Sequence, residues 1–146
     1  MHYKFILYVF VVLVLQGCAL HKLSYQPSGF SGGYSDEPLE NGQHYVTFSG
    51  NGDVDLETVV DFAILRAAIL AEQKQAPAFS LSEMDFNYDV LQVQGHGSFY
   101  KPYAKMVVTF KHTSAVDAFD TARTIKKIQA KYQLTEQQLM RKQDTK

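Results

Sequence analysis

The sequence predicts a small two-layer α+β domain, in which a sheet of three or four strands carries two helices on one face in the order ββαββα. Two long segments place apolar residues at helical spacing, and several shorter segments alternate apolar with polar residues. Glycine, proline or asparagine separates most of these segments. The chain has 146 residues, 46% of them hydrophobic and 20% charged, which suits one domain with its own core.

The first expected element is a hairpin with arms at Gly33–Asp36 and His44–Ser49. Asn41-Gly42 between the arms predicts a type I′ turn, because both residues tolerate a positive φ angle. The second arm alternates apolar and polar side chains, and Gly50-Asn51-Gly52 ends it.

The next segment predicts a helix from Leu56 to Lys74, with Asp55 as its N-cap and Pro77 preventing any continuation. Its core-facing stripe is expected to hold Leu56, Val59, Val60, Ala63, Ile64, Ala67, Leu70 and Ala71.

Two further strands are expected at residues 79–86 and 104–112. Between them, Val90–Val93 is able to extend the first strand before Gly95-His96-Gly97 ends it, and the aromatic segment that follows is predicted as a loop. Ser114 is predicted to cap a second helix, with Asp117 in a partial capping box. Its buried face is expected to hold Ala115, Ala118, Phe119, Ala122, Ile125 and Tyr132, and residues 135–138 open a short last helix.

The amino terminus resembles a bacterial lipoprotein signal. An apolar run that is too short to cross a bilayer ends in Leu15-Gln16-Gly17-Cys18, with cleavage expected between Gly17 and Cys18. Cys18 is the only cysteine, so its thiol is the expected site of lipid attachment and no disulfide is expected. An uncleaved anchor helix and an ordinary signal peptide with an incidental cysteine are the alternatives.

These assignments divide the chain into a signal peptide (1–17), a lipidated tether (18–32), a globular domain (33–133) and a polar tail (134–146). Several acyl chains on Cys18 hold a protein stably at a membrane. Ala19 follows the cysteine where an aspartate resembles an inner-membrane retention signal, so the outer membrane, facing the periplasm, is the expected location.

The chain contains three short motifs, Gly33-Tyr-Ser-Asp36, Val46-x-Phe-x-Gly-Asn51 and Leu65-Arg-Ala-Ala68. Together they resemble a family of small uncharacterised proteobacterial envelope lipoproteins. The resemblance covers residues 32–72 and implies a location and a fold, without catalytic residues. The strand after the helix departs from the family pattern at Gln75–Phe79. Arg66 lies beside an apolar stripe, so we expect it to reach a carboxylate or carbonyl on a neighbouring element.

The sequence predicts no catalytic constellation. The acids at residues 51–57 lack the glycine and glutamate that an EF-hand calcium loop requires at its sixth and twelfth positions, so helix-start acids explain them better. The histidines have no zinc-ligand spacing, and nucleophile-elbow and nucleotide-loop motifs are missing. We therefore expect no enzyme activity, metal or cofactor, and a net charge of −1 argues against nucleic acid as a partner.

Two features remain as interaction candidates. Residues 18–100 carry a net charge of −8 and residues 101–146 one of +6, which concentrates on Arg123, Lys126, Lys127 and Lys131. These cations either complement the acidic half of the domain or bind an anionic partner. The second feature is the segment with His96, Phe99, Tyr100 and Tyr103, whose aromatic rings either pack over the sheet edge or stack on a ligand.

The expected function is accordingly a non-catalytic binding or structural module of the envelope, with membrane lipid and another envelope protein as its expected partners. The alternative is a binder of peptidoglycan fragments or anionic lipid through the aromatic and basic segment.

Overall fold

The computed structural model describes residues 23–113 and 117–139. Along the chain the elements are β1 (Gly33–Pro38), β2 (His44–Ser49), α2 (Leu56–Gln73), β3 (Ala78–Val93), β4 (Gly97–Lys111), β5 (Phe119–Asp120), α3 (Thr121–Tyr132) and α4 (Glu136–Leu139). The α+β class is confirmed, but the described sheet has five antiparallel strands in the order β1-β2-β4-β3-β5, more than the sequence predicts. The unpredicted strand, β5, pairs with the first two residues of β3.

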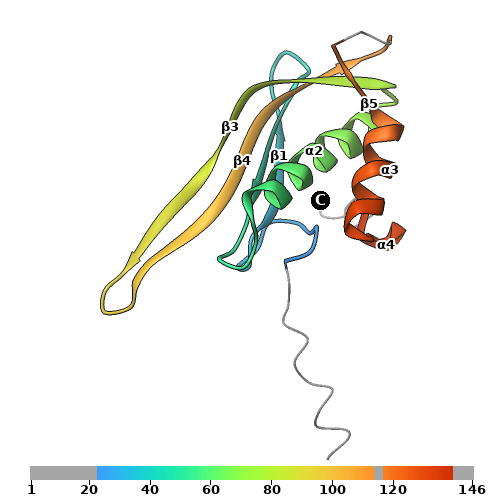
Figure 1. Ribbon diagram of the computed structural model, residues 1–146. Coiled ribbons are helices and arrows are strands. Elements are labelled where there is room, and N and C mark those ends of the chain that lie inside the picture. Colours follow the sequence, from blue (N-terminus) through green and yellow to red (C-terminus); the bar gives the residue numbers. More distant parts are fainter. Residues whose placement is uncertain (1–22, 114–116, 140–146) are drawn as a thin grey trace, which may run out of the picture.

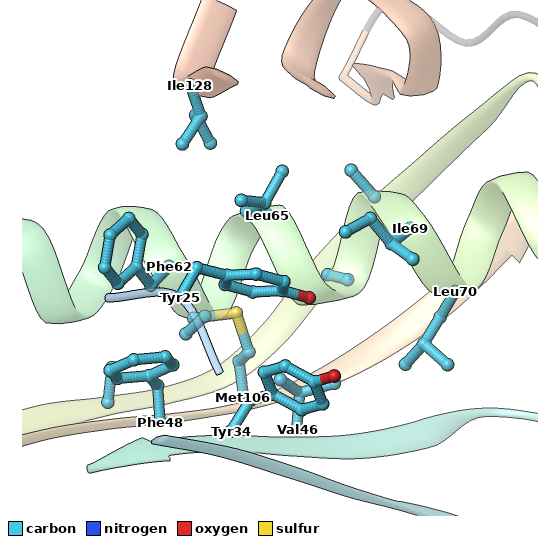
Figure 2. Close-up of a cluster of buried hydrophobic side chains, with 14 of the residues drawn as sticks. Tyr25, Tyr34, Val46, Phe48, Phe62, Leu65, Ile69, Leu70, Met106 and Ile128 are labelled. Atoms are coloured by element: carbon cyan, nitrogen blue, oxygen red, sulfur yellow. The ribbon is translucent and has the colours of Figure 1, made fainter. Parts of the chain in front are cut away.

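The two long helices do not lie side by side on the sheet. Helix α2 covers one face of the sheet, and α3 packs against α2 on the side away from the strands (Figure 1). Figure 2 shows Ile128 of α3 above Leu65, while Phe48 and Met106 of the sheet lie below the helix. The predicted two-layer arrangement is therefore wrong, because α2 has neighbours on two sides.

The burial of α2 explains this stacking. Its predicted bounds and Asp55 cap are confirmed to within one residue, and the Asp55 carboxylate accepts a hydrogen bond from the Thr58 amide at 2.7 Å. The predicted stripe is too narrow, however, since Phe62, Leu65 and Ile69 outside it are also buried. A helix that is apolar over most of its circumference requires a second packing partner besides the sheet.

Helix α2 connects two strands that are parallel to each other. Strands β2 and β3 each pair antiparallel with β4, which lies between them. Since β3 and β4 are joined by a hairpin, the chain returns through the middle of the sheet. This places the end of β2, the start of β1 and the projecting part of β3 and β4 at one end of the sheet.

Residues 23–32 belong to the folded domain, which corrects the predicted tether. Leu23 is 6% exposed and Tyr25 is fully buried. The Tyr25 ring stacks on Tyr34 at 4.8 Å between centroids and meets the edge of Phe62 at 5.8 Å. Although residues 23–32 are rich in serine and glycine, the buried Tyr25 ring holds this segment against the core.

The predicted polar tail also begins too early. Leu134 and Leu139 are buried in the core, and Gln138 Nε2 donates a hydrogen bond to Ser24 Oγ at 2.7 Å. The short helix expected over residues 135–138 is present as α4. The two ends of the described chain therefore contact each other.

Two turn and cap predictions fail. The β1–β2 hairpin is confirmed, but Gly42 has a positive φ angle (79°) while Asn41 does not, so the turn is not type I′. The predicted cap Ser114 lies outside the described residues, and α3 begins at Thr121, where Asp120 accepts a hydrogen bond from the Arg123 amide.

The buried face predicted for the second helix is correct only in part. Ile125 and Tyr132 pack against the core, whereas Ala122 is exposed. Phe119 lies in β5 rather than in a helix, and its ring stacks on Phe79 at 5.3 Å. The apolar spacing of Phe119 reflects strand pairing and not a helix face.

Candidate functional site

The feature that distinguishes this fold is a two-stranded hairpin that extends beyond the sheet. Pairing of β2 with β4 ends at Ser49 and Tyr103, whereas pairing of β3 with β4 continues to Val93 and Gly97. We call residues 88–102 the hairpin arm. Figure 1 shows it projecting past the remainder of the described chain.

Local sequence sets where the arm begins and ends. The Pro102 carbonyl accepts a hydrogen bond from the Gly50 amide at 2.7 Å, at the point where β2 leaves β4. Proline lacks an amide donor and suits such an edge position. The register shifts between Ser82 and Asp85, with Glu83 at φ 49°, a bulge of the kind that bends a strand. Gly95 and Gly97, both with positive φ, form the turn at the tip.

The arm exposes large apolar side chains on both of its faces. Six of them, each between 44% and 58% exposed, are Tyr88, Val90, Leu91, Val93, Phe99 and Tyr100. By the register, Tyr88, Val90 and Tyr100 continue the core-facing side of the sheet, while Leu91, Val93 and Phe99 point the opposite way. A two-stranded ribbon has no second layer to cover either face.

The predicted aromatic loop is therefore a strand, and its residues do not converge. His96 lies at the turn, Tyr100 lies on one face, and Phe99 and Tyr103 lie on the other. Packing over the sheet edge is wrong for Phe99 and Tyr100, which are 50% and 58% exposed. The four residues cannot close around one ligand in this arrangement.

Tyr103 is held differently from the other three. Its hydroxyl donates to the Asp85 carboxylate at 3.3 Å, and Lys105 Nζ lies 4.6 Å from the centroid of its ring. Desolvation, with the Asp85 charge next, raises the pKa of the Tyr103 phenol. Tyr103 thus forms part of the base of the arm.

The arm is also not basic. It contains one acid, Asp89, and one base, Lys101, and the register places these two opposite each other. From Val90 to Tyr100 the sequence has no Asp, Glu, Lys or Arg. The segment is therefore not the aromatic and basic loop that the sequence suggested. Its tip has no formal charge, and one acid and one base lie opposite each other at its base.

The four cations predicted on α3 separate into two groups. Lys131 donates to Asp61 at 2.6 Å and to Glu57, both on α2. The Asp61 and Glu57 carboxylates raise the pKa of the Lys131 ammonium group. Arg123, Lys126 and Lys127 are exposed and form no ion pair with any described residue. The expectation that these cations complement acids in the first half of the domain is confirmed for Lys131 alone.

Arg66 fulfils the expectation of a partner on a neighbouring element. Its Nε donates to Asp36 Oδ1 of β1 at 2.6 Å, and its guanidinium lies 4.4 Å from the centroid of Tyr34. Burial is the largest single influence and opposes the charge, but the Asp36 hydrogen bond and the nearby Asp36, Tyr25 and Tyr34 side chains together raise the pKa of Arg66. Burial also raises the pKa of the Tyr25 phenol, an effect that the Arg66 charge opposes. This cluster is buried and connects α2 with β1.

The acids at residues 51–57 serve the start of α2. Asn51 Oδ1 accepts a hydrogen bond from the Asp53 amide at 3.1 Å, and Asp55 is the N-cap. Within the described ranges, no three His, Cys, Asp or Glu side chains group as metal ligands. No helix among those residues is long and apolar enough to cross a membrane.

Two surface cavities lie away from the arm. One, of about 340 Å³, is lined by Leu23, Phe62 and Lys131 among others, and the second, of about 350 Å³, by Gln43, Lys74 and His112 among others. In the first, Lys131 and the Tyr132 hydroxyl both donate to Asp61, so these polar groups already have partners.

The extension of the strand through Val90–Val93 is confirmed, but sequence reasoning missed that the apolar side chains of this part of β3 remain exposed, namely Tyr88, Val90, Leu91 and Val93. The signal is visible in retrospect as two alternating segments of similar length on either side of Gly95-His96-Gly97. Comparison of the chain with protein-family models, curated proteins and solved structures gives no match.

Proposed function

We propose that this chain is a lipid-anchored protein of the bacterial cell envelope, attached through an acylated Cys18 at the periplasmic side of the outer membrane. It acts there as a non-catalytic binding or structural module, and the hairpin arm is its binding element. The observation that carries the binding role is the exposure of six large apolar side chains on a projecting ribbon. Monomeric proteins rarely leave such a surface uncovered unless it meets a partner.

The buried polar cluster supports kinship with the small envelope lipoproteins that the sequence resembles. Asp36 of the Gly-Tyr-Ser-acid motif and Arg66 of the Leu-Arg-Ala-Ala motif contact each other directly. This contact gives a structural reason why the two motifs occur together in one chain. It supports a role in stability, and no catalytic role is proposed for them.

Fractionation of cells that produce the wild-type chain or Cys18→Ser tests the anchoring. Acylated protein sediments with the envelope and, on a density gradient, with the outer membrane. The Cys18→Ser variant is expected to leave the outer-membrane fraction, because it has no thiol to acylate. Equal recovery of both variants in the outer-membrane fraction contradicts the proposal.

A second candidate function is the binding of peptidoglycan fragments. Tyr88 and Tyr100 lie on the same face of the arm and are 44% and 58% exposed, which suits stacking on sugar rings. Titration with soluble peptidoglycan fragments, followed by tyrosine fluorescence, tests this candidate. A saturable change that is lost in Tyr100→Ser supports it, and no change at about 1 mM ligand excludes a useful affinity.

A further inference from the structure

We propose that the tip of the hairpin arm, residues 90–100, inserts into the interfacial region of the lipid bilayer to which Cys18 anchors the chain. This inference rests on the proposed function and names the environment that its binding element meets. It makes the arm a second attachment point, which fixes how the domain is oriented over the membrane.

The distribution of apolar residues along the arm favours a bilayer over a protein partner. Toward the tip both faces carry large exposed apolar side chains, with Val90 and Tyr100 on one face, next to the polar pair Gln92 and Ser98, and Leu91 and Phe99 on the other. A protein docked on one face leaves the opposite face in water. A bilayer interface surrounds the tip and covers both faces at once.

The charges mark a boundary for insertion. The first charged residues above the tip are Asp89 and Lys101, which lie opposite each other, and residues 90–100 carry no formal charge. Four residues of strand separate Asp89 from Val93, about 13 Å at the usual rise. That length is sufficient for the depth of about 5–10 Å to which amphipathic segments insert into the interface.

The free strand edges limit the depth. Among the described residues, positions 90–100 of β3 and β4 pair only with each other, so each strand has an outer edge of amide and carbonyl groups without a strand partner. These groups require water or headgroup partners and are excluded from the hydrocarbon core. The tip is therefore interfacial and does not span the membrane.

The described chain enters the sheet at the end from which the arm projects. Gly33 pairs with Ser49, and Ser49 pairs with Tyr103, so the chain enters the sheet where the arm begins. The Tyr34 amide donates to the Gln26 carbonyl at 2.8 Å, which holds the preceding segment at that end as well. The arm extends six residues past Tyr103, about 20 Å. The five residues from Cys18 to Leu23 reach at most about 18 Å, so both points are able to meet one membrane surface.

The test uses the mature acylated protein reconstituted into phosphatidylethanolamine vesicles, with and without phosphatidylglycerol. Ser98→Cys places an environment-sensitive fluorophore at the exposed tip, and Gln73→Cys places one on the exposed end of α2 away from the arm. The wild-type chain is the labelling control, because an acylated Cys18 offers no thiol. Labelling of wild-type protein at Cys18 would show a free thiol and contradict the proposed lipid attachment. The position of the Ser98 fluorophore still decides whether the tip inserts.

We expect the Ser98 fluorophore to shift to the blue and to be quenched by brominated lipids, and the Gln73 fluorophore to do neither. Because the tip is uncharged, the shift should be the same without phosphatidylglycerol and in high salt. A Ser98 fluorophore that stays in water overturns the proposal. A shift that appears only when envelope proteins are added also overturns it and points to a protein partner.

A second variant separates insertion from anchoring. Leu91→Asp with Phe99→Asp is expected to return the Ser98 fluorophore to water while the protein stays on the vesicles through Cys18. Without acylation, the same two substitutions should weaken vesicle binding by about tenfold or more. An unchanged signal in a variant with an unchanged melting temperature contradicts the role of the apolar tip.

Discussion

Arg66 on α2 and Asp36 on β1 form a buried ion pair, with 2.6 Å between Nε and Oδ1 and side chains that are 8% and 18% exposed. The Arg66 guanidinium also lies over Tyr34, whose ring stacks on Tyr25. The pair therefore connects the edge of the sheet, the central helix and the amino-terminal segment in one place.

Removing one partner of this pair should destabilise the domain strongly. In Asp36→Ala the Arg66 guanidinium stays buried without its carboxylate, which typically costs about 3 kcal/mol or more. Urea denaturation measures the change, and Asp53→Ala, at an exposed acid, serves as the control with a change within about 0.5 kcal/mol. Equal losses in the two variants would show that the pair adds nothing specific.

Stability should fall as the pH is lowered below neutrality, in part because of His44. Burial, with the Lys74 charge next, lowers the pKa of the His44 imidazole in the folded protein from 6.5. As the pH falls through about 6.5, the unfolded chain takes up this proton before the folded chain does, so the free energy of unfolding decreases. Denaturation curves between about pH 5.5 and 7.5 should show a smaller decrease for His44→Gln.

The matched control is His96→Gln, since His96 is exposed at the turn of the arm. It should follow the wild-type pH dependence. If His44→Gln and His96→Gln behave alike, His44 is not the group responsible.

Gly33 should tolerate no side chain. At its φ of 130°, an added Cβ lies 2.4 Å from the Pro27 carbonyl oxygen, so backbone must move. We expect Gly33→Ala to cost more than about 2 kcal/mol and to loosen residues 23–32 from the core. Gly29→Ala is the control, because nothing lies within 4 Å of its added Cβ. Hydrogen exchange at the amides of residues 23–34 reports the loosening, and unchanged protection in Gly33→Ala contradicts it.

The free cations of α3 are the second surface to test. Arg123→Glu with Lys126→Glu and Lys127→Glu should leave the fold intact, because none of the three pairs with a described residue. If the face binds an anionic envelope protein, cross-linking in whole envelopes should lose that partner. Lys131→Glu is the matched control, since it disrupts contacts to Glu57 and Asp61 instead. Identical cross-linked products in wild type and the triple variant would exclude the basic face as a binding site.

Much of the fold was predictable because local signals and tertiary contacts agree. The spacing and cap of α2 placed the helix to within a residue, and Arg66 beside an apolar stripe indicated a distant partner. Both predictions depend on rules that hold within one helix, namely capping and the cost of an unpaired buried charge.

The failures arise where a tertiary contact decides the outcome. Nothing near Tyr25 in the sequence shows that its ring completes the core, and nothing near Phe119 shows that it stacks on Phe79. The second strand of the arm was missed for a related reason. Exposed aromatic residues next to glycine and proline were interpreted as a loop, since strands are expected to bury one face.

The chemical state of the mature amino terminus tests the account most directly. Mass spectrometry of the protein recovered from the envelope should show a chain that begins at Cys18, with acyl groups added to its sulfur and terminal amine. A chain that retains Met1–Gly17, or one whose Cys18 thiol is unmodified, would contradict both the anchored domain and the membrane-facing orientation of its hairpin arm.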